Sequence, residues 1–90
     1  MLQMGKKNIT FGDREKHTID ISWSDWTGVV TIKIDNQRKN DLFFQDLIPS
    51  VPRSFDYTIG TNEVHSVHVE IGYGAYTPST TVYLDGSMIE

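Results

Sequence analysis

Apolar and polar side chains alternate along most of this chain, with a period of two residues. The alternation runs through residues 18–23, 30–34, 55–59, 67–71 and 82–84. A period of two places one set of side chains on a core and the other in water, which is typical of half-buried antiparallel strands. β-branched residues are frequent in the same stretches, as they are in strands generally. The sequence therefore predicts an all-β fold.

Turn signals fall between the alternating stretches. Asp35-Asn36 and Asp85-Gly86 each follow an apolar stretch and suit tight hairpin turns. Short strands that are separated by evenly spaced turns are typical of a β-sandwich or a β-barrel. About eight strands are expected, near residues 8–11, 17–23, 29–34, 41–47, 54–59, 64–71, 79–84 and 87–90.

The two halves of the chain resemble each other. Residues 10–21 align with residues 58–69, and Thr, Gly, Glu and His are identical at matched positions. After a two-residue insertion, residues 31–36 align with residues 81–86. Two similar strand groups that each bury one face are expected to pack on each other as two sheets. We therefore predict a single antiparallel β-sandwich domain over residues 1–90, built from two similar halves.

The composition narrows the possible functions. The chain has 90 residues and no cysteine, which excludes a disulfide framework, a thiolate metal site and a cysteine nucleophile. Eight basic and 12 acidic side chains give a net charge of −4, which argues against nucleic acids and anionic membranes as partners. The apolar runs are too short to span a bilayer, and the first residues lack the apolar core of a signal peptide. We expect a cytoplasmic protein without a cofactor.

Several short motifs follow one another in an order that resembles a known family. They are a His-x-Ile-x-Ile strand at residues 17–21, a Thr-Gly hairpin at 27–28, an Ile-x-Ile-Asp strand end at 32–35, an aromatic strand at 42–44, a Phe-to-Gly stretch at 55–60 and a closing strand and turn at 81–86. Together they resemble the domain of the Fas apoptosis inhibitory molecule family. In this chain Asn36 stands where the family usually has Gly, and the aromatic strand lacks the family's Trp.

The resemblance implies an eight-stranded antiparallel β-sandwich. The family is described as regulating cell death and protecting against protein aggregation. It brings no recognised enzymatic residues to carry over to this chain. The animal proteins of the family carry two such domains, whereas one domain is predicted here.

Three histidines are the first candidates for chemistry. His17 and His65 occupy equivalent positions two residues before Ile19 and Val67, so strand alternation points both inward. We expect each ring to pack at a strand end, with one nitrogen bonded to a backbone carbonyl. A zinc site needs three or four convergent ligands, and His65 and His68 should point to opposite faces of a strand. No metal site is predicted.

The carboxylates do not suggest catalysis. Asp35 and Asp85 fall in hairpin turns, where an Asp side chain accepts bonds from backbone N–H groups. Glycoside hydrolysis needs two carboxylates facing each other across a cleft, and a sandwich of this size has little room for one. The sequence also has no P-loop and no Gly-x-Ser-x-Gly motif. We therefore predict that the protein is not an enzyme.

Two aromatic loops are the main candidates for binding. Residues 22–28 and 72–78 connect equivalent strands of the two halves. Trp23 keeps the inward alternation and is assigned to the core. The loop aromatics either form a contact surface, because Trp and Tyr dominate binding hot spots and stack on sugars, or fold back to close an end of the sandwich, which is the favoured interpretation. The candidate contact residues are Trp26, Tyr73 and Tyr76, with Asp25 and Thr27 beside them.

An edge strand is a further candidate for contact. A strand near residues 40–48 could pair with a second copy of the chain, or the charges of Arg38, Lys39 and Asp41 could prevent such pairing. The sequence thus predicts a non-catalytic binding or protein-interaction module, whose partner is another protein or a second copy. The alternatives are a carbohydrate-binding module that uses the loop aromatics, a hydrolase, and a regulatory domain of a larger assembly.

Overall fold

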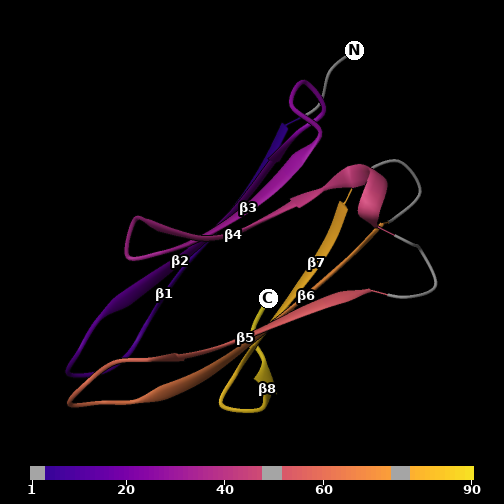
Figure 1. Cartoon of the computed structure of the whole chain (residues 1–90). Helices are drawn as coiled ribbons and strands as arrows, with labels where there is room; N and C mark the ends of the chain where they lie inside the picture. The colour runs from indigo at the N-terminus through magenta and orange to yellow at the C-terminus, as the bar shows by residue number, and fades with distance from the viewer. Residues whose placement is uncertain (1–3, 48–51, 74–77) are drawn as a thin grey trace.

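Two β-sheets make up the computed structural model, which describes residues 4–47, 52–73 and 78–90. Figure 1 shows the sheet of the first half in indigo to magenta and the sheet of the second half in coral through orange to yellow. The elements within the described residues are β1 (Met4–Phe11), β2 (His17–Ser24), β3 (Val29–Ile34), β4 (Gln37–Phe43), a 3₁₀ turn (Phe44–Asp46), β5 (Arg53–Ile59), β6 (His65–Tyr73), β7 (Pro78–Leu84) and β8 (Ser87–Met88).

The two sheets have the same topology. The first has the strand order β1-β2-β3-β4 and the second the order β5-β6-β7-β8, with every neighbouring pair antiparallel. The registers correspond as well, because Phe11 pairs with His17 in the first half and Ile59 with His65 in the second. The prediction of an antiparallel sandwich built from two similar halves is confirmed.

The third hairpin of each sheet turns as predicted. Asp35 and Asn36 have φ values of 51° and 66°, and Asp85 and Gly86 have φ values of 51° and 87°. Two consecutive residues with positive φ form the turn that matches the right-handed twist of a hairpin, and Asp, Asn and Gly tolerate this conformation best. The same local chemistry therefore closes the same hairpin in both halves.

The core lies between the sheets and is built from β-branched side chains. Its most deeply buried members come from the central strands β2, β3, β6 and β7, where both sides of the backbone are paired. They are Ile19, Ile21, Val30, Ile32, Val67, Val69, Ile71 and Val82, each at most 1% exposed. Such side chains fit the pleated inner face of a sheet. Burial of each contributes about 1.5–3 kcal/mol relative to exposure.

Trp23 extends this core towards one end of the first sheet, as predicted. The residue is half-buried and packs against the core cluster. Its indole lies across Gly5 of β1, because a Cβ atom added at Gly5 would lie 2.1 Å from Cζ2 of Trp23. Only a residue without a side chain leaves room for the indole at this position.

The fourth strand differs from the prediction. It begins at Gln37, directly after the two-residue turn, and ends at Phe43 rather than near residue 47. The chain then makes a 3₁₀ turn in which the Phe44 N–H donates to the Gly28 carbonyl at 2.8 Å and the Leu47 N–H to the Phe44 carbonyl at 3.0 Å. This turn buries Leu47 in the core, which a continued strand along β3 would not do. Among the described residues, no helix is long and apolar enough to cross a membrane.

Candidate functional site

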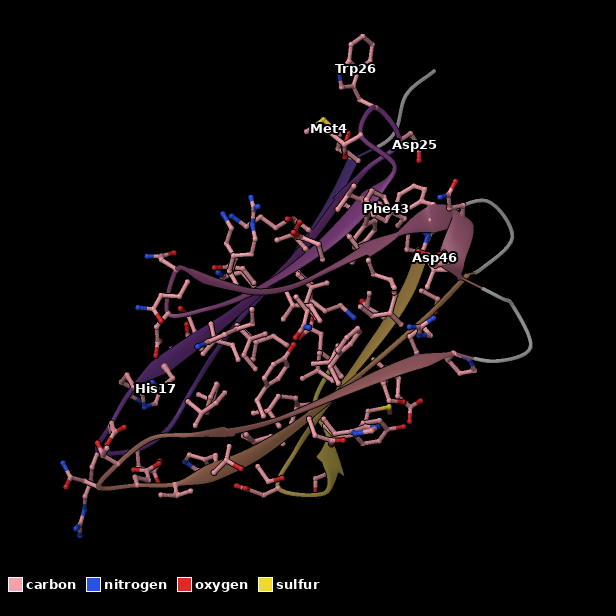
Figure 2. All side chains as sticks on the ribbon, in the orientation of Figure 1. Met4, His17, Asp25, Trp26, Phe43 and Asp46 are labelled. Carbon is pink, nitrogen blue, oxygen red and sulfur yellow. The ribbon has the colours of Figure 1, made fainter. Side chains whose placement is uncertain are left out.

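The predicted aromatic site is only partly within the described structure. Trp26 lies at the tip of the β2–β3 turn and is 78% exposed, so the prediction that it folds back to close the sandwich is wrong (Figure 2). Beside it, Asp25 is half-buried, and Thr27 is exposed with its Oγ1 donating to the Ser24 carbonyl at 3.3 Å. Tyr76 lies outside the described residues. Tyr73 ends β6, and its side chain also lies outside them.

Other apolar side chains share this end of the first sheet. Met4 is 79% exposed and Phe43 is 54% exposed, and both are labelled near Trp26 in Figure 2. The strand register places Met4 opposite Ser24, and Val29 opposite both Ser24 and Phe43. One row therefore crosses all four strands of the outer face. We name Met4, Trp26, Val29 and Phe43 the apolar end surface.

Sequence reasoning missed three members of the apolar end surface, Met4, Val29 and Phe43. Phe43 belongs to an apolar run in which the neighbouring Leu42 is buried, so strict alternation would have placed Phe43 outward. Met4 lies before the predicted start of the first strand. It becomes part of a surface only because β1 pairs with β2 all the way back to Met4.

A second group of functional-looking residues lies at the opposite end of the sandwich, near His17 in Figure 2. Two hairpin loops, one from each sheet, lie side by side there (Figure 1). The Glu15 carboxylate accepts hydrogen bonds from the backbone N–H groups of residues 61–63, at 2.9–3.4 Å. The Glu63 carboxylate accepts hydrogen bonds from those of residues 13–15, at 2.7–3.4 Å. Each half of the repeat thus supplies the anion for the other half's loop.

Each of these glutamates also contacts a histidine. In the first half, His17 Nε2 lies 2.5 Å from Glu15 Oε2, and His17 Nδ1 lies 2.6 Å from Asp35 Oδ2. His65 has the same two distances to Glu63 and Asp85. We name these groups the Glu15 cluster (Glu15, His17 and Asp35) and the Glu63 cluster (Glu63, His65 and Asp85). The predicted carbonyl partner of each histidine is wrong, because both ring nitrogens contact carboxylates.

The inward packing of the two histidines is confirmed. The side chains of His17 and His65 are 14% and 17% exposed. Their ring centroids lie 5.8 Å and 5.5 Å from that of Phe11, which contacts both. A charged imidazole ring beside an aromatic ring is a favourable pair. Phe11 therefore joins the two clusters across the end of the core.

The clusters shift the acid–base equilibria of their members. Hydrogen bonds from the Asn62 backbone and from His17 lower the pKa of Glu15 to about 2. Hydrogen bonds from the Arg14 backbone and from His65 lower the pKa of Glu63 to about 2. A histidine that donates from both nitrogens must be protonated.

The aspartates have the matching effect on the histidines. Hydrogen bonding to Asp35, followed by that to Glu15, raises the pKa of His17. The corresponding bonds to Asp85 and Glu63 raise the pKa of His65. The bonds to the histidines in turn lower the pKa values of the two aspartates, Asp35 and Asp85. Each cluster is thus a cation held between two anions.

The hydrogen bonds of the two clusters link the loops and strand ends of the two sheets, which is a structural role. Asp35 and Asp85 also accept the backbone N–H groups of Thr18 and Ser66, at 3.0 and 2.8 Å. Every carboxylate of the clusters is therefore bonded both to backbone and to a histidine. Within the described part of the chain, no group of three or more His, Asp or Glu side chains is arranged to hold a metal ion.

The third histidine faces the outside of the second sheet, opposite to His65, as its spacing predicted. His68 Nδ1 lies 2.6 Å from Asp56 Oδ1, and its Nε2 lies 3.1 Å from Glu70 Oε1. The Tyr83 ring lies beside it, with centroids 5.6 Å apart. Hydrogen bonding to Asp56 and then to Glu70 raises the pKa of His68. This group is an exposed ladder across three strands rather than a concave site.

A groove of about 490 Å³ runs between the edge strands β4 and β5. Tyr57 lines this groove, and its hydroxyl donates to the Asn40 side chain. Burial raises the pKa of Tyr57 to about 12, so the phenol stays neutral at physiological pH. The groove is lined by residues that include Ile34, Lys39, Asp56, Tyr57 and Ile59, together with His17 of the Glu15 cluster.

Comparison of the chain with protein-family models, with curated proteins and with solved structures finds no match.

Proposed function

We propose that this protein is a non-catalytic protein-interaction module and that its contact surface is the apolar end surface. The observation that carries this proposal is the exposure of Met4, Trp26 and Phe43, at 79%, 78% and 54%, at one end of one sheet. Large apolar side chains that gather on a surface are typical of protein contact sites, and Trp is the residue most enriched in hot spots.

The state of the titratable groups supports a non-catalytic role. A general base needs a free lone pair near neutral pH, whereas His17 and His65 each have both nitrogens within 2.6 Å of a carboxylate. The carboxylates of Glu15 and Glu63 are occupied by backbone N–H groups. These bonds favour a structural use for the residues that resemble catalytic groups most.

The resemblance to the Fas apoptosis inhibitory molecule family agrees with an interaction role. That family is described in terms of regulation and protection from aggregation rather than chemistry. A chain without cysteine also suits a reducing compartment. As part of the proposal we place the protein in the cytoplasm, with another protein as its partner.

The proposal is tested by capture from native cell extract with three purified proteins. The wild type is compared with a Trp26→Ala, Phe43→Ala variant and with a Val64→Ala, Met88→Ala control. Val64 and Met88 are 58% and 67% exposed but lie on the second sheet's hairpins, away from the apolar end surface. We expect the wild type and the control to capture a partner protein, and the Trp26→Ala, Phe43→Ala variant (the Trp26 variant) to bind it with an affinity at least about tenfold lower.

Equal capture by all three folded proteins would contradict the proposed contact surface. If no protein is captured but immobilised glycans retain the wild type and not the Trp26 variant, the carbohydrate-binding alternative replaces the proposal. Circular dichroism of each variant must first match that of the wild type. Both pairs of substitutions remove exposed side chains, so neither should unfold the sandwich.

A further inference from the structure

In the described part of the chain, the two open sheets leave four edge strands, β1, β4, β5 and β8. An edge strand presents unpaired backbone N–H and C=O groups, which can pair with another chain. Natural sandwiches protect such edges by short strands, bulges, or charged side chains that point inward. The four edges of this protein differ sharply in how far they are protected.

The β1 edge is protected by a lysine that points inward. Lys7 pairs with Ile21, whose side chain is in the core, so alternation directs Lys7 to the same face. Its ammonium group donates to the Thr80 carbonyl of β7 at 2.8 Å. A new strand beside β1 would have to cover this charge, which disfavours pairing. β8 pairs only with Tyr83 and Leu84 of β7, so Lys7 binds a β7 carbonyl that β8 does not cover.

The β4 and β8 edges are protected by irregularity and by length. The pairing of β3 with β4 shifts between Ile32 and Lys33, which places Lys39 in a bulge next to Arg38. A bulge bends the edge and breaks its hydrogen-bond spacing. β8 has only two residues. The edge strand predicted near residues 40–48 is therefore a poor site for pairing with a second copy.

The β5 edge has such protection only at its first residue, because Arg53 pairs with the core residue Ile71 and alternation directs it to the inner face. Residues 54–59 carry no inward-pointing charge and no bulge. The seven residues of β5 pair with β6 in one unbroken register, from Arg53 opposite Ile71 to Ile59 opposite His65. Phe55 and Tyr57 point inward and pack against the core, yet both remain half-buried. Within the described residues, no strand pairs with β5 on the side away from β6. The groove of about 490 Å³ runs along this free edge. Backbone groups and apolar side chains are thus left open together.

We propose that the β5 edge is the interface of a homodimer, in which β5 of a second copy pairs antiparallel with it and joins the two four-stranded sheets. This interface is separate from the apolar end surface and does not depend on the proposed function. A two-fold axis through Tyr57 places Phe55 opposite Ile59 of the second copy, and Asp56 opposite Thr58. Inward apolar side chains then meet apolar ones, and no like charges face each other.

Charge selects this register over its neighbour. Moving the axis to Asp56 would pair all seven residues, but would place the two Asp56 carboxylates directly opposite each other, which destabilises a sheet. Moving it to Thr58 would leave only three residues of each strand paired. With the axis at Tyr57, five residues of each strand pair and Asp56 faces a neutral hydroxyl.

The dimer is tested first by sedimentation of the full chain over a range of concentrations. We expect the wild type to approach twice its 10.3 kDa mass as concentration rises. Thr58→Asp places an acidic side chain opposite Asp56 twice in each dimer, and should weaken dimerisation at least about tenfold, whereas the Thr58→Asn control should not. Thr58→Lys, which faces Asp56 of the second copy with the opposite charge and leaves the Asp56–His68 bond in place, should strengthen the dimer instead.

Cross-linking tests the register. The chain has no cysteine, so the Asp56→Cys and Thr58→Cys variants carry one thiol each, and both positions are exposed. The two variants are mixed before oxidation. Oxidation should give mainly the mixed disulfide, identified by mass, because directly opposite residues lie within disulfide reach. Lys6→Cys and Thr10→Cys on β1 should give little. A wild type that stays monomeric, or cross-links that do not prefer the mixed pair, would overturn the proposal.

Discussion

Gly12→Ala is expected to lose about 3–5 kcal/mol of unfolding free energy, one of the largest effects of any single substitution in this protein. Gly12 has a φ of +104°, and a Cβ atom added there would lie 2.0 Å from the Glu15 carbonyl oxygen. That oxygen is backbone, so the loop itself must move. Movement would pull residues 13–15 away from Glu63 and leave its carboxylate without their N–H groups.

Gly86→Ala is the matched control. Gly86 has a φ of +87°, but an added Cβ would meet nothing within 4 Å. It should lose only about 1–2 kcal/mol, the cost of a left-handed conformation for a residue with a side chain. Urea titration of both variants measures the difference, which isolates the close approach to the Glu15 carbonyl. Equal losses would contradict this account of the loop.

The repeat provides a second copy of the same experiment. Gly60 has a φ of +108°, and its added Cβ would lie 2.0 Å from the Glu63 carbonyl oxygen. Gly60→Ala should therefore match Gly12→Ala to within the error of the titration. A much smaller loss at Gly60 would show that the two loops are not equivalent in energy.

The stability of the protein is expected to peak between about pH 4.5 and 6.5. Glu15 and Glu63 have pKa values lowered from 4.5 to about 2, so the stability that they add is complete above pH 4.5 and is lost as pH falls towards 2. The pKa values of His17 and His65 are raised from 6.5. Their contribution is complete below pH 6.5 and is lost as pH rises through the raised values.

Denaturant titrations at a series of pH values measure this profile. A Glu15→Gln, Glu63→Gln variant should be less stable at pH 5 and should lose most of the fall in stability between pH 4.5 and 2. Asp35 and Asp85, whose pKa values are also lowered, should leave a smaller residual slope. Glu90→Gln, an exposed carboxyl outside both clusters, is the control and should keep the wild-type profile. An unchanged acid slope in the double variant would be inconsistent with the cluster assignment.

The fold was largely predictable because its causes are local and occur twice. Alternation of apolar residues gave the strands, and the matched turns at Asp35 and Asp85 gave the third hairpin of each half. The alignment of the halves then implied two equivalent sheets. The end of β4 was not predictable from alternation, because the chain leaves β3 to bury Leu47.

The contacts between the halves were harder to predict. Glu15 binds backbone groups 46–48 residues away, and no local pattern encodes a partner at that distance. The repeat did carry a signal, since Glu and His recur at matched positions while their neighbours differ. The exposure of Trp26 had no such signal, because it depends on how the β2–β3 turn leaves the sheet.

The exchange of carboxylates between Glu15 and Glu63 affects how the protein comes apart. If one sheet loses its order, the other sheet loses the anion that neutralises its own loop amides, although its sequence is intact. Two domains with independent cores can unfold in separate steps. In this protein, unfolding of either half would remove the carboxylate that binds the loop of the other half. We therefore expect the two halves to unfold together, as one cooperative unit.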